Sequence, residues 1–303
     1  MNHRGEFACA RLPLQRGEHV AELGIWSDHL SDDDWGVIRR VAPLAGVTPD
    51  EVRTDAGALA KVLVHPAAFE SVFGGPTDTI GLAASPFLVF AVIVHRGWSE
   101  LQHVDHVDEW VGPQRRLPVF SGGVLREFLG SPANRLFVTE LLASYTRVAS
   151  GAVWVHTRRG WRRRRFSELD PLRLASLLEV VPDDERPGVY RRLGDLALFL
   201  TGVFPDHTEM RGLRPHDEGR LLRLSGIGPD RFEPGSTGAV ELLERLGQRW
   251  YQLATRTASV PTASMQVIAD VAGRFGLARR TLNYLADRHL FAPHRDWFGQ
   301  LPT

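Results

Sequence analysis

Apolar residues recur at intervals of three and four along most of this 303-residue chain, a spacing that places them on one face of an α-helix. The clearest stretch runs from residue 185 to 204, where the apolar stripe is long enough to pack against a neighbouring helix. Its members are Val189, Leu193, Leu196, Ala197, Leu200 and Phe204. The pattern therefore predicts a mainly α fold, with several helices packed in bundle-like domains.

Two helix starts in the N-terminal part are marked by capping residues. Ser31 precedes three aspartates, which suit a first helical turn because the helix dipole favours negative charge there. Thr48 precedes a proline, and Glu51 stands three residues after Thr48, as in a capping box. Residues 31–75 are therefore predicted to form a small helical subdomain. Residues 1–30 show no sustained period and predict an irregular N-terminal arm.

A central helical domain is predicted over residues 85–205. Ser85 and the proline after it begin a long helix, whose first half, residues 87–94, is apolar all round and should be buried. Its second half is polar and rich in histidine. The pair Gly112-Pro113 is expected to end this helix.

Glycine and proline become frequent after residue 205. Together with arginine and aspartate they predict a loose connection over residues 206–236. Helical periods then return near residues 238–256, 263–275 and 278–291. The segment 237–303 is therefore expected to hold the C-terminal helices.

One segment has the period of a strand instead of a helix. Residues 153–155, which are Val-Trp-Val, and residues 161–166, which begin with Trp161 and end with Phe166, flank Arg158, Arg159 and Gly160, and this glycine suits a turn. The pattern predicts one small β-hairpin near residues 152–166. Because successive residues of a strand point to opposite faces, only about half of its arginines can share one surface.

Charge is balanced over the whole chain but concentrated in this hairpin. The 36 acidic and 36 basic residues exclude a protein coated throughout with positive charge, yet six arginines fall within the eight positions 158–165. Such crowding is unfavourable unless water or an anion relieves it. We therefore expect the hairpin to bind an acidic protein partner or another anion, in a regulatory or scaffolding role. The residues expected to make the contact are Arg158, Arg159, Trp161, Arg162, Arg163, Arg164 and Arg165.

The arginines also have a purely structural explanation. Guanidinium groups can stack on Trp154 and Trp161 and can pair with carboxylates of the same chain. Such carboxylates include Glu168, Asp170, Asp183 and Asp184. In addition, Lys61 is the only lysine among the 36 basic residues, so a general preference for arginine lengthens any basic run.

Several features bear on the compartment. Cys9 is the only cysteine, which excludes an internal disulfide and a thiolate metal site. The longest apolar run, residues 87–94, is far shorter than the roughly 20 residues that span a bilayer. The first residues contain no apolar core of signal-peptide length. We therefore expect a soluble, cytoplasmic protein with no membrane partner.

No motif indicates a cofactor or a covalent nucleophile. The chain has no Gly-x-Ser-x-Gly, no phosphate-binding loop and no dinucleotide-binding fingerprint. Asp195 lies in the strongest apolar helix and should be partly buried, either as an ion-pair anchor for Arg191 and Arg192 or as a catalytic carboxyl with a raised pKa. Ser144 and its neighbours could line a pocket. We favour the anchor, and expect no cofactor and no enzymatic activity.

Near the C-terminus, residues 268–285 resemble the helix-turn-helix of bacterial repressors, including the LacI family. Ala272 suits the contact between the two helices and Gly276 suits the turn. Ala278 departs from the pattern where Ser or Thr is usual, and Phe275 is bulky before the turn. An ordinary pair of packed helices fits the same residues. The resemblance implies a DNA-binding regulator, an alternative function, with a recognition helix within 268–287. The residues it would present to DNA are Arg279, Arg280, Thr281 and Asn283.

A second alternative is a metal-dependent enzyme. Glu100, His103 and His106 follow one another at three-residue steps, and Glu-x-x-His is the spacing that places two metal ligands on one helix face. The chain has no second Glu-x-x-His, so Asp206 or His207 would have to complete the site. A solvated polar face explains the same residues and is the interpretation we favour.

Overall fold

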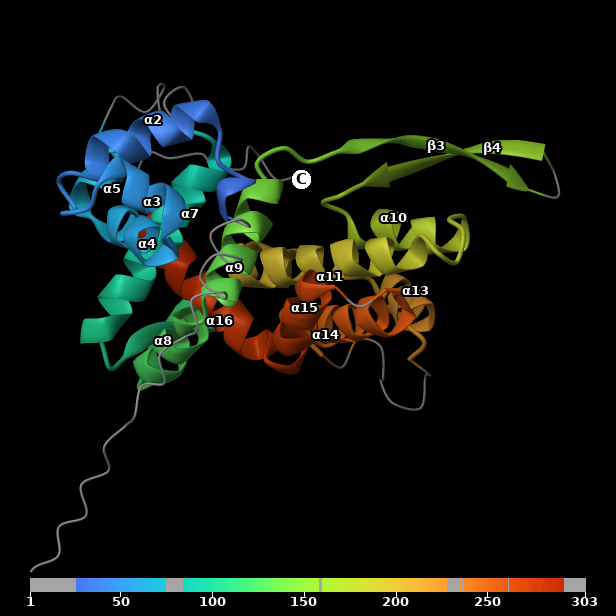
Figure 1. Cartoon of the computed structure of the whole chain (residues 1–303). Helices are drawn as coiled ribbons and strands as arrows, with labels where there is room; N and C mark the ends of the chain where they lie inside the picture. The colour runs from blue at the N-terminus through green and yellow to red at the C-terminus, as the bar shows by residue number, and fades with distance from the viewer. Residues whose placement is uncertain are drawn as a thin grey trace, which may run out of the picture.

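The computed structural model of the chain describes residues 26–74, 84–157, 160–227, 235, 237–260 and 262–291, and of residues 153–166 it describes only the backbone. This part of the chain is mainly α-helical, which confirms the predicted fold class (Figure 1). It also contains two separate two-stranded antiparallel sheets, where one was predicted. None of its helices is long and apolar enough to cross a lipid bilayer.

The elements follow one another along the chain as helices interrupted by the two hairpins. In the N-terminal half they are α2 (Asp32–Val41), α3 (Pro49–Thr54), α4 (Ala56–Val64), α5 (Pro66–Phe73), α7 (Pro86–Glu100), η2 (Leu101–His103), β1 (Val107–Gly112), β2 (Arg115–Val119), α8 (Gly122–Gly130) and α9 (Pro132–Ser144). The second half contains β3 (Ser150–Thr157), β4 (Gly160–Ser167), α10 (Pro171–Ala175), η3 (Ser176–Glu179), α11 (Arg186–Val203), α12 (Pro205–Arg211), α13 (Pro215–Leu224), α14 (Ala239–Thr257), α15 (Ala263–Gly273), α16 (Phe275–Leu285) and the π-helical turn η5 (Ala286–Leu290).

The predicted N-terminal caps are confirmed. Ser31 and Asp34 form a capping box at the start of α2, and Thr48 and Glu51 form another at the start of α3. These helices do not stand apart, because α4 and α5 both contact α7. One cluster of buried apolar residues extends from Trp26 to Leu290. The helices of the predicted subdomain 31–75 therefore share a core with the rest of the described chain.

Glycines allow the helices of the second half to approach closely. A Cβ atom on Gly194 of α11 would lie less than 3.0 Å from the ring of Tyr251 on α14. Likewise, a Cβ atom on Gly202 would lie less than 3.0 Å from Leu282 of α16. Since this is closer than side-chain atoms can pack, α14 and α16 reach their positions only because α11 carries glycine there.

The long helix expected from Ser85 is shorter than predicted. Its apolar half is buried as expected, but α7 ends at Glu100. The polar residues that follow form a 3₁₀ turn and then the β1–β2 hairpin, in which Trp110 pairs with Arg116. The turn contains Pro113 and then Gln114 at φ 56°, the arrangement of a type II turn. Where the second half of the helix was predicted, the chain instead turns back on itself as a hairpin.

The expected loose connection also contains regular structure. Helices α12 and α13 occupy its first half, and α12 contacts both α14 and β1. Residues 228–234 and 236 lie outside the described part, as do residues 1–25 of the predicted N-terminal arm.

Candidate functional site

The arginine hairpin, which we define as β3, β4 and the turn between them, forms where it was predicted. The two strands pair in antiparallel register from Ser150–Ser167 to Thr157–Gly160. In Figure 1 strands β3 and β4 run past α10, and their far ends lie beyond the helices. The hairpin is therefore an arm on the helical body. Arg158 and Arg159, in the turn, lie outside the described residues.

The register sorts the arginine positions into two sets. Arg163 stands opposite Trp154, whereas Arg162 stands opposite Val155 and Arg164 opposite Val153. Residues directly opposite in an antiparallel pair belong to the same face of the ribbon. Trp161 and Arg165 lie an even number of positions from Arg163, so one face combines both tryptophan positions with two arginine positions.

The base of the arm is fixed to the helices through Glu168. The backbone N–H of Ala149 donates to Glu168 Oε2 at 2.8 Å, and the N–H of Glu168 donates to the carbonyl of Ala149 at 3.1 Å. Arg192 of α11 donates to the same carboxylate at 3.2 Å, and its guanidinium lies 4.1 Å from the ring centroid of Tyr145. These contacts tie both ends of the hairpin to α11.

Carboxylates that could have neutralised the hairpin have partners elsewhere. Besides Glu168, Asp170 accepts from two backbone N–H groups at the start of α10 and pairs with Arg173 at 3.2 Å. Asp183 pairs with Arg186 at 2.9 Å. Thus three of the four carboxylates proposed as internal partners already bind cations or donors from the helices.

The predicted helix-turn-helix corresponds to α15 and α16, but the turn lies earlier than expected. The break falls at Arg274, and the bulky Phe275 is the first residue of α16 and is buried. Gly276, expected in the turn, lies inside the helix, where a Cβ atom would meet the carboxylate of Glu244 at 2.7 Å. Gly276 therefore does not form the turn, and the nearest neighbour of a Cβ atom there is the end of a flexible side chain of α14.

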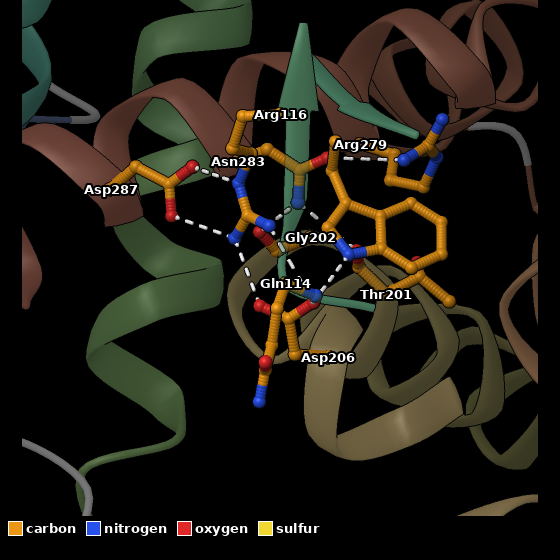
Figure 2. A network of polar contacts seen from close by, with 9 residues as sticks. Gln114, Arg116, Thr201, Gly202, Asp206, Arg279, Asn283 and Asp287 are labelled. Atoms are coloured by element: carbon orange, nitrogen blue, oxygen red, sulfur yellow. Dashed lines mark hydrogen bonds and ion pairs between the residues drawn. The ribbon is translucent and has the colours of Figure 1, made fainter. Parts of the chain in front are cut away.

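The residues expected to contact DNA are engaged inside the protein. Thr281 is buried and its hydroxyl donates to the carbonyl of Leu277 at 2.9 Å. Asn283 is also buried, and its amide donates to the carbonyls of Thr201 and Gly202 at the end of α11, at 3.1 and 2.6 Å (Figure 2). In this conformation neither side chain faces a ligand outside.

The two arginines of α16 make ion pairs. Arg279 donates to Glu244 at 2.7 Å and to the side-chain oxygen of Asn283 at 3.0 Å. Arg280 pairs with Glu109 of β1, with Nε to Oε1 at 2.9 Å. Both guanidinium groups are thus used to attach α16 to neighbouring elements.

A network around Arg116 was not predicted. Its guanidinium pairs with Asp206 of α12 at 3.1 Å and with Asp287 of η5 at 2.7 Å. Asp206 also accepts from the indole N–H of Trp110 at 2.8 Å and from the backbone N–H of Gln114 at 2.7 Å (Figure 2). The network clamps the β1–β2 hairpin onto the helices, and its carboxylates lie about ninety or more positions away from Arg116 in sequence.

The predicted metal ligands do not share a helix. Glu100 is the last residue of α7, while His103 and His106 lie beyond the helix and are exposed. Glu100 pairs with Arg288, and His289 lies 3.5 Å from it. Burial raises the pKa of Glu100, but hydrogen bonds and charge from His289 and Arg288 lower it to about 2. Across the described ranges, no group of three or more His, Cys, Asp and Glu side chains could hold a metal ion.

Comparison with known proteins adds no relative. The chain matches no protein-family model, and no curated protein or solved structure is similar to it.

Proposed function

We propose that this protein acts by binding, and that the arginine hairpin is its contact surface for an acidic protein partner or another anion. The observation that carries the proposal is the arm itself, a ribbon fixed at its base by Glu168 and extending past α10 with four consecutive arginines on β4. Although β4 contacts α10, the arm extends past that helix, so an anionic partner can reach it without rearranging the helices.

Two further observations support the proposal. The internal carboxylates Glu168, Asp170 and Asp183 have partners on the helices. The register also combines Trp154 and Trp161 with Arg163 and Arg165 on one face of the ribbon, and guanidinium and indole groups together suit carboxylates flanked by apolar surface. The proposed role is regulatory or scaffolding, in the cytoplasm, without a cofactor and without a chemical step.

The direct test compares the protein with a variant in which Arg162, Arg163, Arg164 and Arg165 are changed to glutamine. Fluorescence anisotropy with labelled polyglutamate measures binding at low salt. Exposed charge pairs contribute about 0.2–1 kcal/mol each, so removing four should weaken binding between roughly fourfold and several hundredfold. Added salt should also weaken the binding of polyglutamate to the parent protein, because salt screens exposed charges.

The control variant removes the same charge elsewhere. Arg40, Arg214, Arg223 and Arg256 are exposed and lie on or beside helices, so changing them to glutamine tests net charge alone. If the two variants lose polyglutamate affinity equally, the binding site is not on the hairpin. Labelled duplex DNA serves as a second probe: tight binding to DNA, with none to polyglutamate, would favour the DNA-binding alternative over this proposal.

A further inference from the structure

A cleft near the base of the arginine hairpin has the composition of a small-molecule site. It has a volume of about 600 Å³, within the range of ligand pockets, and lies between α9, α11, the start of α7 and the segment around His29. Phe87, Phe137 and Leu141 give it an apolar wall. The polar groups that line it come from His29, Glu140, Arg191 and Asp195, among others.

Two opposite charges stand side by side in this cleft without pairing. Arg191 and Asp195 are four residues apart on α11, so they are neighbours on one helix face. Yet no ion pair within 4.0 Å joins Arg191 to Asp195, both of which the structure describes. The neighbouring Arg192, which also lines the cleft, pairs with Glu168. Arg191 donates to the hydroxyl of Ser264 on α15 at 3.2 Å, and Asp195 accepts from the hydroxyl of Tyr251 on α14 at 2.8 Å. Each charge is thus bound by a hydroxyl group from a neighbouring helix.

The surroundings of these two groups are asymmetric. Asp195 is half-buried, and burial raises its pKa although Arg191, Tyr251 and Arg192 act in the opposite direction. Glu140 lies on the facing helix α9, and its negative charge also raises the pKa of Asp195. A positive group placed between these two carboxylates would offset the cost of burying the charge of Asp195 and would reduce the repulsion between Asp195 and Glu140.

The opposite wall is aromatic and also bears the carboxylate of Glu140. The ring of His29 stacks on Phe87 with centroids 4.7 Å apart, and its Nε2 lies 2.9 Å from Glu140 Oε1. Phe137 and Leu141, one turn apart on α9, continue the apolar surface. A ligand in the cleft would therefore meet Arg191 and Asp195 on the α11 side, and Glu140 together with the apolar surface across from them.

We infer that the cleft binds a small zwitterion with an apolar side chain, of the class of the apolar α-amino acids. The carboxylate of the ligand pairs with Arg191, and its ammonium group lies against Asp195 and Glu140. Arg191 and Asp195, on adjacent turns, suit a head group whose ammonium nitrogen and carboxylate carbon are both bonded to one carbon atom. The side chain of the ligand packs on Phe87 and Phe137. This site is separate from the proposed hairpin surface.

Calorimetric titration of the full chain tests the inference with L-phenylalanine, L-leucine, L-isoleucine and L-methionine. At least one of the four should bind. Two analogues of L-phenylalanine, each keeping only one of its charges, serve as half-ligands: 3-phenylpropionate lacks the ammonium group, and phenethylamine lacks the carboxylate. Each half-ligand should bind at least about tenfold more weakly than its parent, because one charged hydrogen bond is lost. If none of the four amino acids binds, or if a half-ligand binds as tightly as its parent, the inference is wrong.

Variants locate the binding. Arg191→Gln and Asp195→Asn should each weaken binding at least about tenfold, and Asp195→Asn still accepts the Tyr251 hydrogen bond. Arg186→Gln, on the same helix but paired with Asp183, is the control and should bind normally. Unchanged affinity in Arg191→Gln would overturn the inference even if Asp195→Asn fails to fold. The glutamine variant of the arginine hairpin should keep the amino-acid affinity, so this site and the hairpin proposal fail independently.

Discussion

The hydroxyl of Tyr251 on α14 donates a 2.8 Å hydrogen bond to Asp195 on α11, beside the point where Gly194 lets the two helices meet. Burial raises the pKa of Tyr251 well above its usual range, and the charge of Asp195 acts in the same direction, so the phenol stays protonated and remains a donor. The pair joins the two longest described helices of the second half, and Asp195 also lines the cleft.

Gly194→Ala should destabilise the protein by about 1–3 kcal/mol, because the added methyl group would overlap the ring of Tyr251. Urea unfolding measures the change. Gly188→Ala, on the same helix, is the control: its added Cβ atom has nothing within 4 Å, and alanine is the better helix former. The control should be neutral or slightly stabilising. Equal effects of the two substitutions would mean that α11 and α14 do not pack this closely.

Asn283→Ala should cost about 1–3 kcal/mol of stability, since two carbonyls at the buried end of α11 would lose their donor. The comparison is with Gln252→Ala, at an exposed position on α14, which should change the free energy of unfolding little. A residue whose purpose is to contact DNA would instead tolerate alanine without loss of stability. That outcome would restore α16 as a candidate recognition helix.

Glu100→Gln should destabilise the protein in a pH-dependent manner. The carboxyl has a folded-state pKa of about 2, against 4.5 for its ordinary value, so ionised Glu100 favours the folded state above about pH 4.5. This contribution falls as the pH drops from about 4.5 towards 2. Urea unfolding at pH 7, 4.5 and 3 should therefore show a stability difference between variant and parent that shrinks on acidification. A difference independent of pH would refute the proposed ion pairs with Arg288 and His289.

Glu168→Ala should loosen the base of the arginine hairpin without unfolding the helices. It removes the acceptor shared by the N–H of Ala149 and the guanidinium of Arg192. Hydrogen exchange should accelerate in peptides covering residues 149–152, while α11 keeps its protection. Asp183→Ala breaks a surface pair with Arg186 and should leave exchange near the hairpin unchanged. No acceleration in the Glu168 variant would show that the base is held by other contacts.

The elements predicted correctly from the sequence are those whose signals are local. Ser31 and Thr48 lie next to the acidic residues that complete their capping boxes, so the start of each helix is encoded within four residues. The signal for the arginine hairpin was equally local, because residues 153–155 and the aromatic Trp161 and Phe166 favour strands. Gly160, predicted in the turn, is instead the first residue of β4 and pairs with Thr157.

The elements that were missed depend on distant partners. The polar stretch after Glu100 resembles the solvated end of a helix, and its hairpin is held by Asp206, which binds Trp110 from 96 positions away. Similarly, Thr281 and Asn283 are polar residues at helical spacing, and only the carbonyls of Thr201 and Gly202 show that Asn283 faces inward. The cleft unites α9 and α11, and the sequence singled out only individual residues of it, namely Ser144, Arg191, Arg192 and Asp195.

The central claim is that an acidic ligand binds on the β3–β4 arm, and hydrogen exchange with and without polyglutamate tests it most directly. We predict slower exchange in peptides covering residues 150–167 at low salt, with recovery when salt is added and no change over α14 or α16. Protection confined to another part of the chain, or none at polyglutamate concentrations that saturate the anisotropy signal, would contradict the account.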